Sequence, residues 1–448
     1  MRKKLRAFGV LTIGVLTVLG LAWPSAASAT VPGVNSMVSI NQSGTNGGNL
    51  DSYRPYMSGD GRFVAFDSSA SNLVSSDTNN QNDIFERNLA SGVTTRVSVS
   101  SSGVQANASN IVNAVSRTGR YILFRGGASN LIDGSTISSS YYQLYMRDTA
   151  TNTTTLISQN SSGDPANNNV DGLDVSSDGR FVLLDTAATN LGPTVTNTGN
   201  NLYMFDRDTG TFTILNKAYD GSLPNTTSWT PFGHMSCDGS LVAFQSAANL
   251  TTTSSSHVDI YLLDLRSGNH LTDLTASANT AALDPTISCN GDYVGLLSAA
   301  DNLDTSITDT SMNNYHAYAY NRVNGTFSVV DQSSSGTAGN LGILYYPLSG
   351  SEQYMGLGDN GVAVFQSPAT NLVSGVTSGH RDVYVHSLAT GATELLSRNS
   401  SGTEGDADST APTISVDGKI AAYPSNATNL VAGDTNGYPD AFTSETGY

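Results

Sequence analysis

The stretch MSGDGRFVAFDSSASNLVSSDTNNQNDIFERNLASGVTTRVSV, residues 57–99, decides the fold of this chain. Three of its segments, at 62–66, 83–87 and 94–99, are rich in β-branched and aromatic residues and are bounded by Gly, Asn, Asp and Ser. That pattern is typical of β-strands. A further short strand ends at Met57, and Gly-containing turns join the first strand to the second and the third to the fourth. The stretch therefore predicts a four-stranded antiparallel sheet.

The same unit recurs along the chain. Its turn glycine returns at intervals of 52 to 70 residues, at Gly61, Gly119, Gly179, Gly239, Gly291, Gly361 and Gly418. A variant of Ala-x-Asn-Leu follows each second strand, beginning at Ala70, Ala128, Ala188, Ala247, Ala300, Ala369 and Ala427. One such sheet cannot bury both of its faces, so neighbouring sheets must stack, and a closed ring protects the outer two. The two markers together predict an all-β, seven-bladed β-propeller with four-stranded antiparallel blades.

The two ends of the chain complement each other. The last repeat has strand segments near 413–415, 420–423 and 440–443 but no fourth strand. Residues 36–40, followed by NQSGTNGG, are similar to the fourth strand of the first repeat and the loop after it, RVSVSSSGVQAN. We expect this N-terminal strand to close the last blade, because pairing would remove an exposed sheet edge.

Residues 1–29 have the features of an export signal. Four basic residues precede an apolar stretch, and Ala27-Ser28-Ala29 provides a small-residue cleavage site. We expect a signal peptide at 1–29 and a single propeller domain at 30–448, in a secreted protein or, in a cell with an outer membrane, a periplasmic one. Removal of the signal peptide takes away four basic residues and no acidic ones, so the net charge of −17 becomes −21. So acidic a surface argues against nucleic acid and anionic membranes as partners. No second hydrophobic span follows, so we expect no membrane insertion. We also expect a monomer.

The repeats also carry a family resemblance. The recurring S-x-D-G turn, the apolar second strand, the A-S-N-L step and the D-I-F or D-V-Y third strand resemble the repeats of TolB-type bacterial propellers, distant relatives of WD-repeat propellers. The resemblance implies the propeller fold for the whole mature chain. It leaves the function open, because such propellers serve as partner-binding platforms, as scaffolds beside hydrolase domains and sometimes as enzymes.

Motifs that carry chemistry are few. The sequence contains no G-x-S-x-G, no H-E-x-x-H and no P-loop. The favoured interpretation is a secreted, non-catalytic propeller that binds an extracellular protein or glycan. The alternative is an extracellular propeller enzyme that acts on a polysaccharide or another polymer. An enzyme of this kind would gather carboxylate, His or Arg side chains near the ring axis.

Two loops have oxygen-bearing side chains at regular spacing. Such side chains are the ligands that calcium prefers. The candidate metal ligands are Asp77, Asn79, Gln81 and Asp83 in the first repeat, and Asp434, Asn436 and Asp440 in the last. Neither loop has the Gly and distal Glu of an EF-hand, and Asx-turns that cap a loop are the favoured explanation of the same residues. Calcium is the one cofactor that the sequence suggests, and the favoured expectation is no cofactor.

Cys237 and Cys289 are the two cysteines of the chain. They occupy the same position of adjacent repeats, in SCDG and SCNG, just before the turn that follows the innermost strand. Neighbouring blades converge there, and an exported protein permits oxidation. We expect an inter-blade disulfide; the alternative is two buried free thiols.

The longest interval between turn glycines, 70 residues, contains an insertion at about 340–353. It carries Tyr345 and Tyr346, which are candidate binding residues because exposed aromatic side chains stack on sugars and peptides. We expect a partner to contact this insertion on the face that bears the long loops. The alternative is a disordered rim loop or an irregular first strand.

Overall fold

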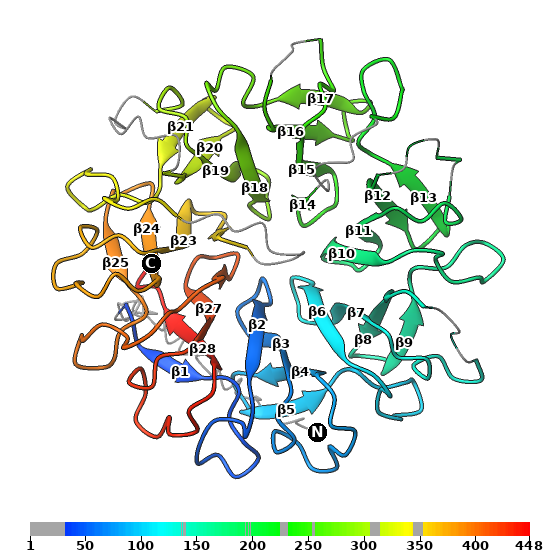
Figure 1. The fold of residues 1–448 in the computed structure, drawn as a ribbon, viewed down its shortest axis with the longest axis horizontal. Coiled ribbons are helices and arrows are strands. Elements are labelled where there is room, and N and C mark those ends of the chain that lie inside the picture. The colour runs from blue at the N-terminus through cyan, green and yellow to red at the C-terminus, as the bar shows by residue number, and fades with distance from the viewer. Residues whose placement is uncertain are drawn as a thin grey trace, which may run out of the picture.

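The computed structural model is an all-β ring of seven sheets. It describes residues 32–448 except 136, 138–139, 193, 196, 198, 225–231, 253–255, 305–313 and 344–352. Each sheet has four antiparallel strands, and the sheets stand around a central axis like the blades of a propeller (Figure 1). The predicted signal peptide lies outside the described residues. Within these residues, no helix is long and apolar enough to cross a membrane.

In each blade the four strands follow one another in chain order from the axis outward, except that in blade seven the outermost strand comes from the N-terminus. The innermost strands of blades one to seven are β2 (Ser52–Met57), β6 (Asn110–Val115), β10 (Val170–Val175), β14 (Gly233–Met235), β18 (Ala282–Ile287), β22 (Met355–Leu357) and β26 (Thr413–Ile414). The second strands are β3 (Phe63–Ser68), β7 (Tyr121–Gly126), β11 (Phe181–Thr186), β15 (Leu241–Ser246), β19 (Tyr293–Ser298), β23 (Val362–Ser367) and β27 (Ile420–Ser425). The third strands are β4 (Asp83–Asn88), β8 (Gln143–Asp148), β12 (Asn201–Asp206), β16 (Asp259–Asp264), β20 (His316–Asn321), β24 (Asp382–Ser387) and β28 (Asp440–Glu445). The outermost strands are β5 (Val93–Arg96), β9 (Thr153–Leu156), β13 (Thr211–Ile214), β17 (His270–Asp273), β21 (Thr326–Val329), β25 (Thr393–Leu395) and, in blade seven, β1 (Asn35–Met37).

The two sequence markers have distinct structural roles. In the S-x-D-G turn of blade one, Ser58 Oγ donates to Asp60 Oδ1 at 2.8 Å, and Gly61 has a φ of 71°, a conformation that glycine adopts at little cost. In the Ala-x-Asn-Leu step of blade two, the Ala128 carbonyl accepts the Tyr145 hydroxyl at 2.8 Å. The Asn130 amide donates to the Gln105 carbonyl of the preceding blade's exit loop at 2.9 Å. One marker thus shapes the hairpin, and the other fastens each blade to the one before.

The hydrophobic core lies between the blades. Buried aliphatic and aromatic side chains form seven clusters, each of which joins two neighbouring blades. The last of these clusters places Ala422 and Ala441 of blade seven against Val64 and Phe66 of blade one. Because apolar burial is the main stabilising term in folding, the closed ring buries the faces that an open arc would leave exposed.

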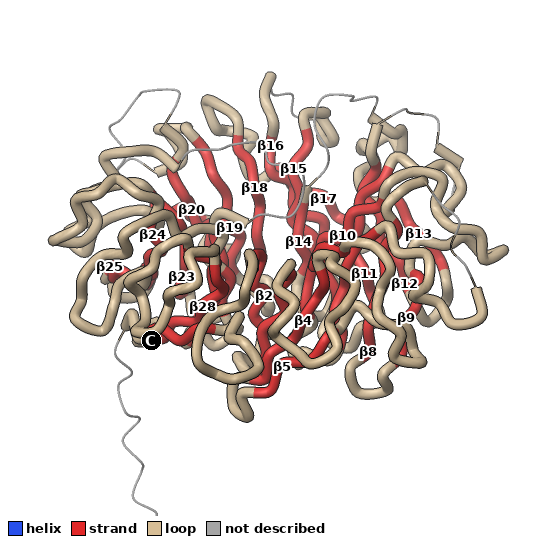
Figure 2. Tube along the Cα trace, turned by 60° about the horizontal axis from the view of Figure 1, so that its bottom comes forward, coloured by secondary structure: helices blue, strands red, loops and turns tan. Residues whose placement is uncertain are grey.

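The N-terminal strand closes blade seven, as the sequence predicts. Strand β1 pairs antiparallel with β28, with Ser36 opposite Thr443. Asn35 extends the contact to blade six, because its amide donates to the Leu396 carbonyl at 2.9 Å. The strands run between two loop-bearing ends of the ring, and the tight hairpin turns and the long loops lie at opposite ends (Figure 2).

Candidate functional site

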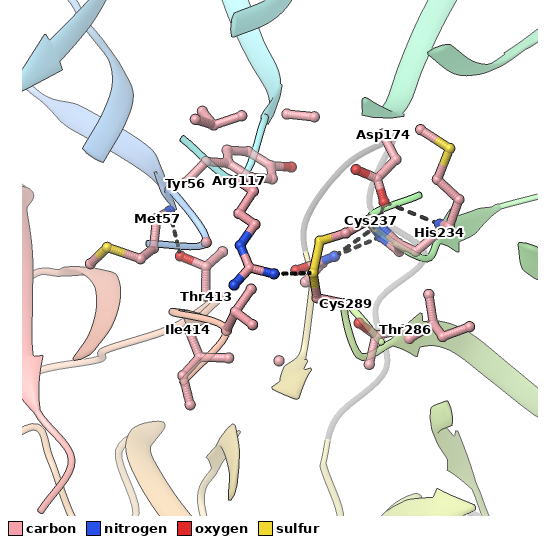
Figure 3. Close-up of a pocket in the computed structure, with 18 of the residues that line it drawn as sticks. Tyr56, Met57, Arg117, Asp174, His234, Cys237, Thr286, Cys289, Thr413 and Ile414 are labelled. Atoms are coloured by element: carbon pink, nitrogen blue, oxygen red, sulfur yellow. Dashed lines mark hydrogen bonds and ion pairs between the residues drawn. A yellow bond between two sulfur atoms is a disulfide. The ribbon is translucent and has the colours of Figure 1, made fainter. Parts of the chain in front are cut away.

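A cavity of about 140 Å³ lies on the axis of the ring. All seven innermost strands line it with residues from their last positions and from the S-x-D-G turns, so it lies at the tight-turn end. Figure 3 shows Arg117 pointing across it from blade two towards the Cys237–Cys289 disulfide, with Asp174 and His234 side by side near that wall. The partner site that the sequence predicts, over the long loops, is at the opposite end of the ring.

Irregular backbone sets the direction of several axial side chains. Strands β2, β6, β10 and β18 each carry a bulge against the second strand of their blade. Arg54 and Asp284 lie within two of these bulges at φ 49° and 52°, which is uncommon for residues other than glycine. Bulges commonly redirect a side chain next to a functional site. Here one of them turns Asp284 towards the neighbouring blades.

Four polar side chains from four blades meet beside the cavity. His234 Nδ1 lies 3.4 Å from Asp174 Oδ2, and its Nε2 lies 2.6 Å from Gln353 Nε2. Asp284 accepts the Tyr354 backbone N–H at 3.1 Å. Burial raises the pKa of Asp284 to about 7, although that hydrogen bond and the charge of His234 oppose the rise. We refer to Asp174, His234, Asp284 and Gln353 as the axial cluster.

The end of the cavity is narrowed by Arg117 and the disulfide. Cys237 and Cys289 are bonded to each other, with their Cα atoms 4.6 Å apart, as the sequence predicts. Arg117 Nη1 lies 3.5 Å from Cys289 Sγ. Burial raises the pKa of Asp359, and the nearby charge of Arg117 lowers it. A positive side chain therefore lies across the axis at this end.

The candidate calcium ligands of blade one surround an arginine. Arg96 Nη2 lies 3.3 Å from Asp77 Oδ1, and its Nε lies 3.7 Å from Asp83 Oδ2. Asn79 donates to Asp83 at 2.8 Å, and Gln81 accepts the Ser109 hydroxyl at 2.9 Å. The guanidinium thus provides the positive charge that these carboxylates need.

The corresponding loop of blade seven has no such arginine. Asn436 donates to Asp440 at 2.7 Å, and Asp434 lies close by. Burial raises the pKa of both Asp434 and Asp440 to about 6. Over the described part of the chain, no three His, Cys, Asp or Glu side chains come together as a metal cluster.

Tyr345 and Tyr346 lie outside the described residues. The last residue of the predicted insertion, Gln353, is described, and it contacts His234 in the axial cavity. The sequence analysis did not identify Arg117, Asp174, His234 or Asp284 as site residues. The available signal was positional: Asp174 and His234 both stand two residues before the Ser of an S-x-D-G or S-C-D-G turn, at the end of an innermost strand.

The chain was compared with known proteins. No protein-family model and no curated protein matches it. An oligogalacturonate lyase from Vibrio parahaemolyticus is similar in structure, with 13% identity, coverage of 92% of this chain and 93% of that one, and a TM-score of 0.51. An oligogalacturonate lyase in complex with manganese is similar at 12% identity, 93% and 97% coverage and a TM-score of 0.51.

TolB from Acinetobacter baumannii is also similar, at 12% identity and a TM-score of 0.43. The match covers 75% of this chain and spans about 63% of the TolB chain. The chain has the seven-bladed propeller fold that its repeats indicate. At these identities the likenesses show the fold alone.

Proposed function

We propose that this chain is a non-catalytic propeller that binds an extracellular protein or glycan on its loop-bearing surface. The size of the axial cavity is the observation that carries the proposal. Its volume of about 140 Å³ is below the roughly 300–1,000 Å³ of pockets that hold small organic ligands. Two larger pockets, of about 670 and 720 Å³, are lined by residues of the outermost strands and the loops near them, so a protein or a polymer of sugars would be held by the outer surface and not on the axis.

The contacts inside the cavity support the same function. Gln353 Nε2 lies within hydrogen-bond distance of both ring nitrogens of His234, Asp174 lies 3.4 Å from Nδ1, and Asp284 accepts a backbone N–H. Side chains engaged with one another in this way fix the positions of neighbouring blades. The cluster is therefore explained as a structural network that holds blades three to six together.

An extracytoplasmic location is part of the proposal. The Cys237–Cys289 disulfide supports it, because disulfides persist in oxidising compartments and are rare in the cytosol. The n-region and cleavage site at 1–29 point the same way. The ring has a four-stranded sheet in every blade, so we expect it to need no second copy and to act as a monomer.

Polysaccharide binding without cleavage is the direct test. The purified mature protein is run in native gels containing pectin, xylan, cellulose derivatives or peptidoglycan fragments, and the same mixtures are analysed for new reducing ends and unsaturated products. We expect retardation by a glycan, or capture of a defined protein from the native culture medium, with the polymer left intact. Chain cleavage would contradict the proposal.

A second candidate function is an enzyme that acts on a polysaccharide, and the axial cluster is the observation that favours it. A histidine flanked by carboxyl groups, one with a pKa near 7, has the composition of an acid–base site. If any cleavage is found, His234→Ala and Asp284→Asn should each abolish it. The exposed His270 of β17 is the matched control, and His270→Ala should leave cleavage unchanged.

A further inference from the structure

In the five blades whose loop is described at this point, one position of the loop before the third strand corresponds to one position of the outermost strand, and the residue pair differs between blades. In blade one the pair is Asp77 and Arg96, which form an ion pair of 3.3 Å with side chains that are almost fully buried. Apolar pairs within a common hydrophobic cluster replace it in three other blades: Ile137 with Leu156, Val195 with Ile214, and Val376 with Leu395. The position thus accepts an ion pair or two apolar groups.

In blade seven the pair consists of an acidic residue and an apolar residue. Asp434 stands where blade one has Asp77, since the loops read DTNGYPD and DTNNQND. Met37 stands where blade one has Arg96, because Met37 pairs with Phe442 as Arg96 pairs with Phe85. Blade seven therefore keeps the carboxylate and has lost the cation that accompanies it.

Among the described residues, one oxygen of the Asp434 carboxylate has no hydrogen-bond partner. Its residue is 7% exposed, and its Oδ1 accepts no hydrogen bond and is shielded from solvent. No ion pair involving Asp434 or Asp440 occurs within the described ranges. An unpaired carboxylate in such a place costs free energy, because burial removes the water that would solvate it.

The surroundings of Asp434 are oxygen-rich. Asp440 is fully buried 6 residues further on in the chain and interacts with it electrostatically. Ser39 Oγ donates to Asp440 Oδ1 at 2.5 Å, and the Gly48 carbonyl accepts the Asn436 amide at 2.8 Å. Ser39 and Gly48 belong to the N-terminal segment, so this segment and the loop of β28 meet at one place.

We propose that blade seven binds a divalent cation of the calcium type between Asp434 and Asp440, where the guanidinium of Arg96 lies in blade one. Calcium takes carboxylate, amide and carbonyl oxygens in flexible geometry. Asp434 Oδ1 is the free ligand here. Asp440 would share its oxygens with the hydrogen bonds from Ser39 and Asn436, as Asp83 shares its oxygens with Ser98, Asn79 and the Arg96 guanidinium in blade one. The remaining ligands would be carbonyl oxygens and water. The cation would connect the loop before β28 to the N-terminal segment, so that it reinforces the closure of the ring.

Calcium binding to the mature protein tests this directly. Metal-stripped protein is titrated with calcium chloride by calorimetry, and its thermal unfolding is followed in calcium and in EDTA. We expect one calcium per chain and a Tm higher in calcium by ~2 °C or more, since a ligand bound only to the folded state stabilises it. Equal Tm values without binding heat, or a shift with magnesium and none with calcium, would overturn the proposal.

Three variants locate the site. Asp434→Asn should abolish the calcium-dependent rise in Tm, whereas the matched Asp77→Asn in blade one should retain it. Met37→Arg should supply the missing guanidinium, raise the Tm in EDTA and remove the response to calcium. A calcium response that survives Asp434→Asn places the ion elsewhere. If the native chain binds no calcium and Asp434→Asn raises its Tm, Asp434 is a buried carboxyl that no bound cation compensates, and the proposal is wrong.

Discussion

Cys237 of blade four and Cys289 of blade five are joined twice, by a disulfide between their side chains and by a hydrogen bond between their backbones. The Cys237 N–H donates to the Cys289 carbonyl at 2.9 Å. The same type of backbone contact links blade seven to blade one, where the Val416 N–H donates to the Gly59 carbonyl at 2.8 Å. The turns at the axial end are thus bonded from blade to blade, and the disulfide strengthens one of these links.

Removal of the disulfide should lower stability without changing the fold. Cys237→Ser combined with Cys289→Ser frees a loop of 52 residues in the unfolded chain, and we expect a loss of about 2–4 kcal/mol in the free energy of unfolding. Chemical denaturation of the two proteins measures it, with circular dichroism to compare the folds. Thiol labelling of the denatured, unreduced native chain should find no reactive thiol; two labelled thiols would contradict the bond.

The N-terminal strand should be required for full stability. Deletion of residues 32–41 removes β1 and leaves β28 as an unpaired edge, which favours association between chains. We expect a lower Tm and concentration-dependent aggregation, measured by calorimetry and light scattering. An unchanged Tm would show that β1 contributes little to closure.

Asn35 provides a milder version of the same test. Its side chain donates to the Leu396 carbonyl at 2.9 Å and accepts the Tyr423 hydroxyl at 2.5 Å. Asn35→Ala removes both hydrogen bonds and leaves the Tyr423 hydroxyl with its longer bond to the Leu396 carbonyl, 3.3 Å, and we expect a loss of about 1–3 kcal/mol in the free energy of unfolding. The variant should remain monomeric, because the strand itself is kept. Association of Asn35→Ala would show that the side chain, and not the strand, protects the edge.

The fold was readable from the sequence because each repeat contains its own strands and turns. The positions of Gly61 and of Ala70 recur in every blade, since every blade needs the same hairpin and the same connection to the preceding blade. The axial cluster gives no such signal. Asp174, His234 and Asp284 come from three consecutive repeats, and only the packing of blades three, four and five brings them together.

The candidate metal loops show a second limit of the sequence. The spacing from Asp77 to Asp83 suggested cation ligands, and a cation is indeed present there as the guanidinium of Arg96. Arg96 comes 13 residues after Asp83 and on the next strand, so its approach to both carboxylates follows from strand pairing. The spacing of acidic residues alone does not distinguish an internal arginine from a bound ion.

The turn glycines should differ in how much they tolerate a side chain. Gly179 and Gly210 have similar φ values, 72° and 68°. A Cβ on Gly179 would lie 2.5 Å from the ring of Tyr121 in the neighbouring blade, whereas one on Gly210 would meet nothing within 4 Å. We expect Gly210→Ala to cost about 1 kcal/mol from backbone strain, and Gly179→Ala to cost about 2–4 kcal/mol because the blades must separate. Equal losses in the free energy of unfolding, measured by urea denaturation, would show that the Tyr121 ring moves away from residue 179 at little cost.

Glu86 should make stability depend on pH. It lies on β4 between Ala65 and Thr95 and is 8% exposed, and burial raises its pKa from 4.5 to about 7. Between these values the folded protein holds a proton that the unfolded chain releases. Its contribution to stability is therefore fully present below pH 4.5, declines as the pH rises towards 7 and is lost above it.

Glu86→Gln isolates this effect from the other buried carboxyl groups, which are common to both proteins. Glutamine carries no charge at any pH, so the variant should match the native chain near pH 4.5 and exceed its free energy of unfolding by ~1–3 kcal/mol at pH 8. Urea denaturation at a series of pH values measures the difference. Because Glu86 is buried, this gain should persist at high salt. A variant that is less stable than the native chain at pH 8 would show that the carboxylate form is stabilised in the fold, and that the pKa of Glu86 is not raised.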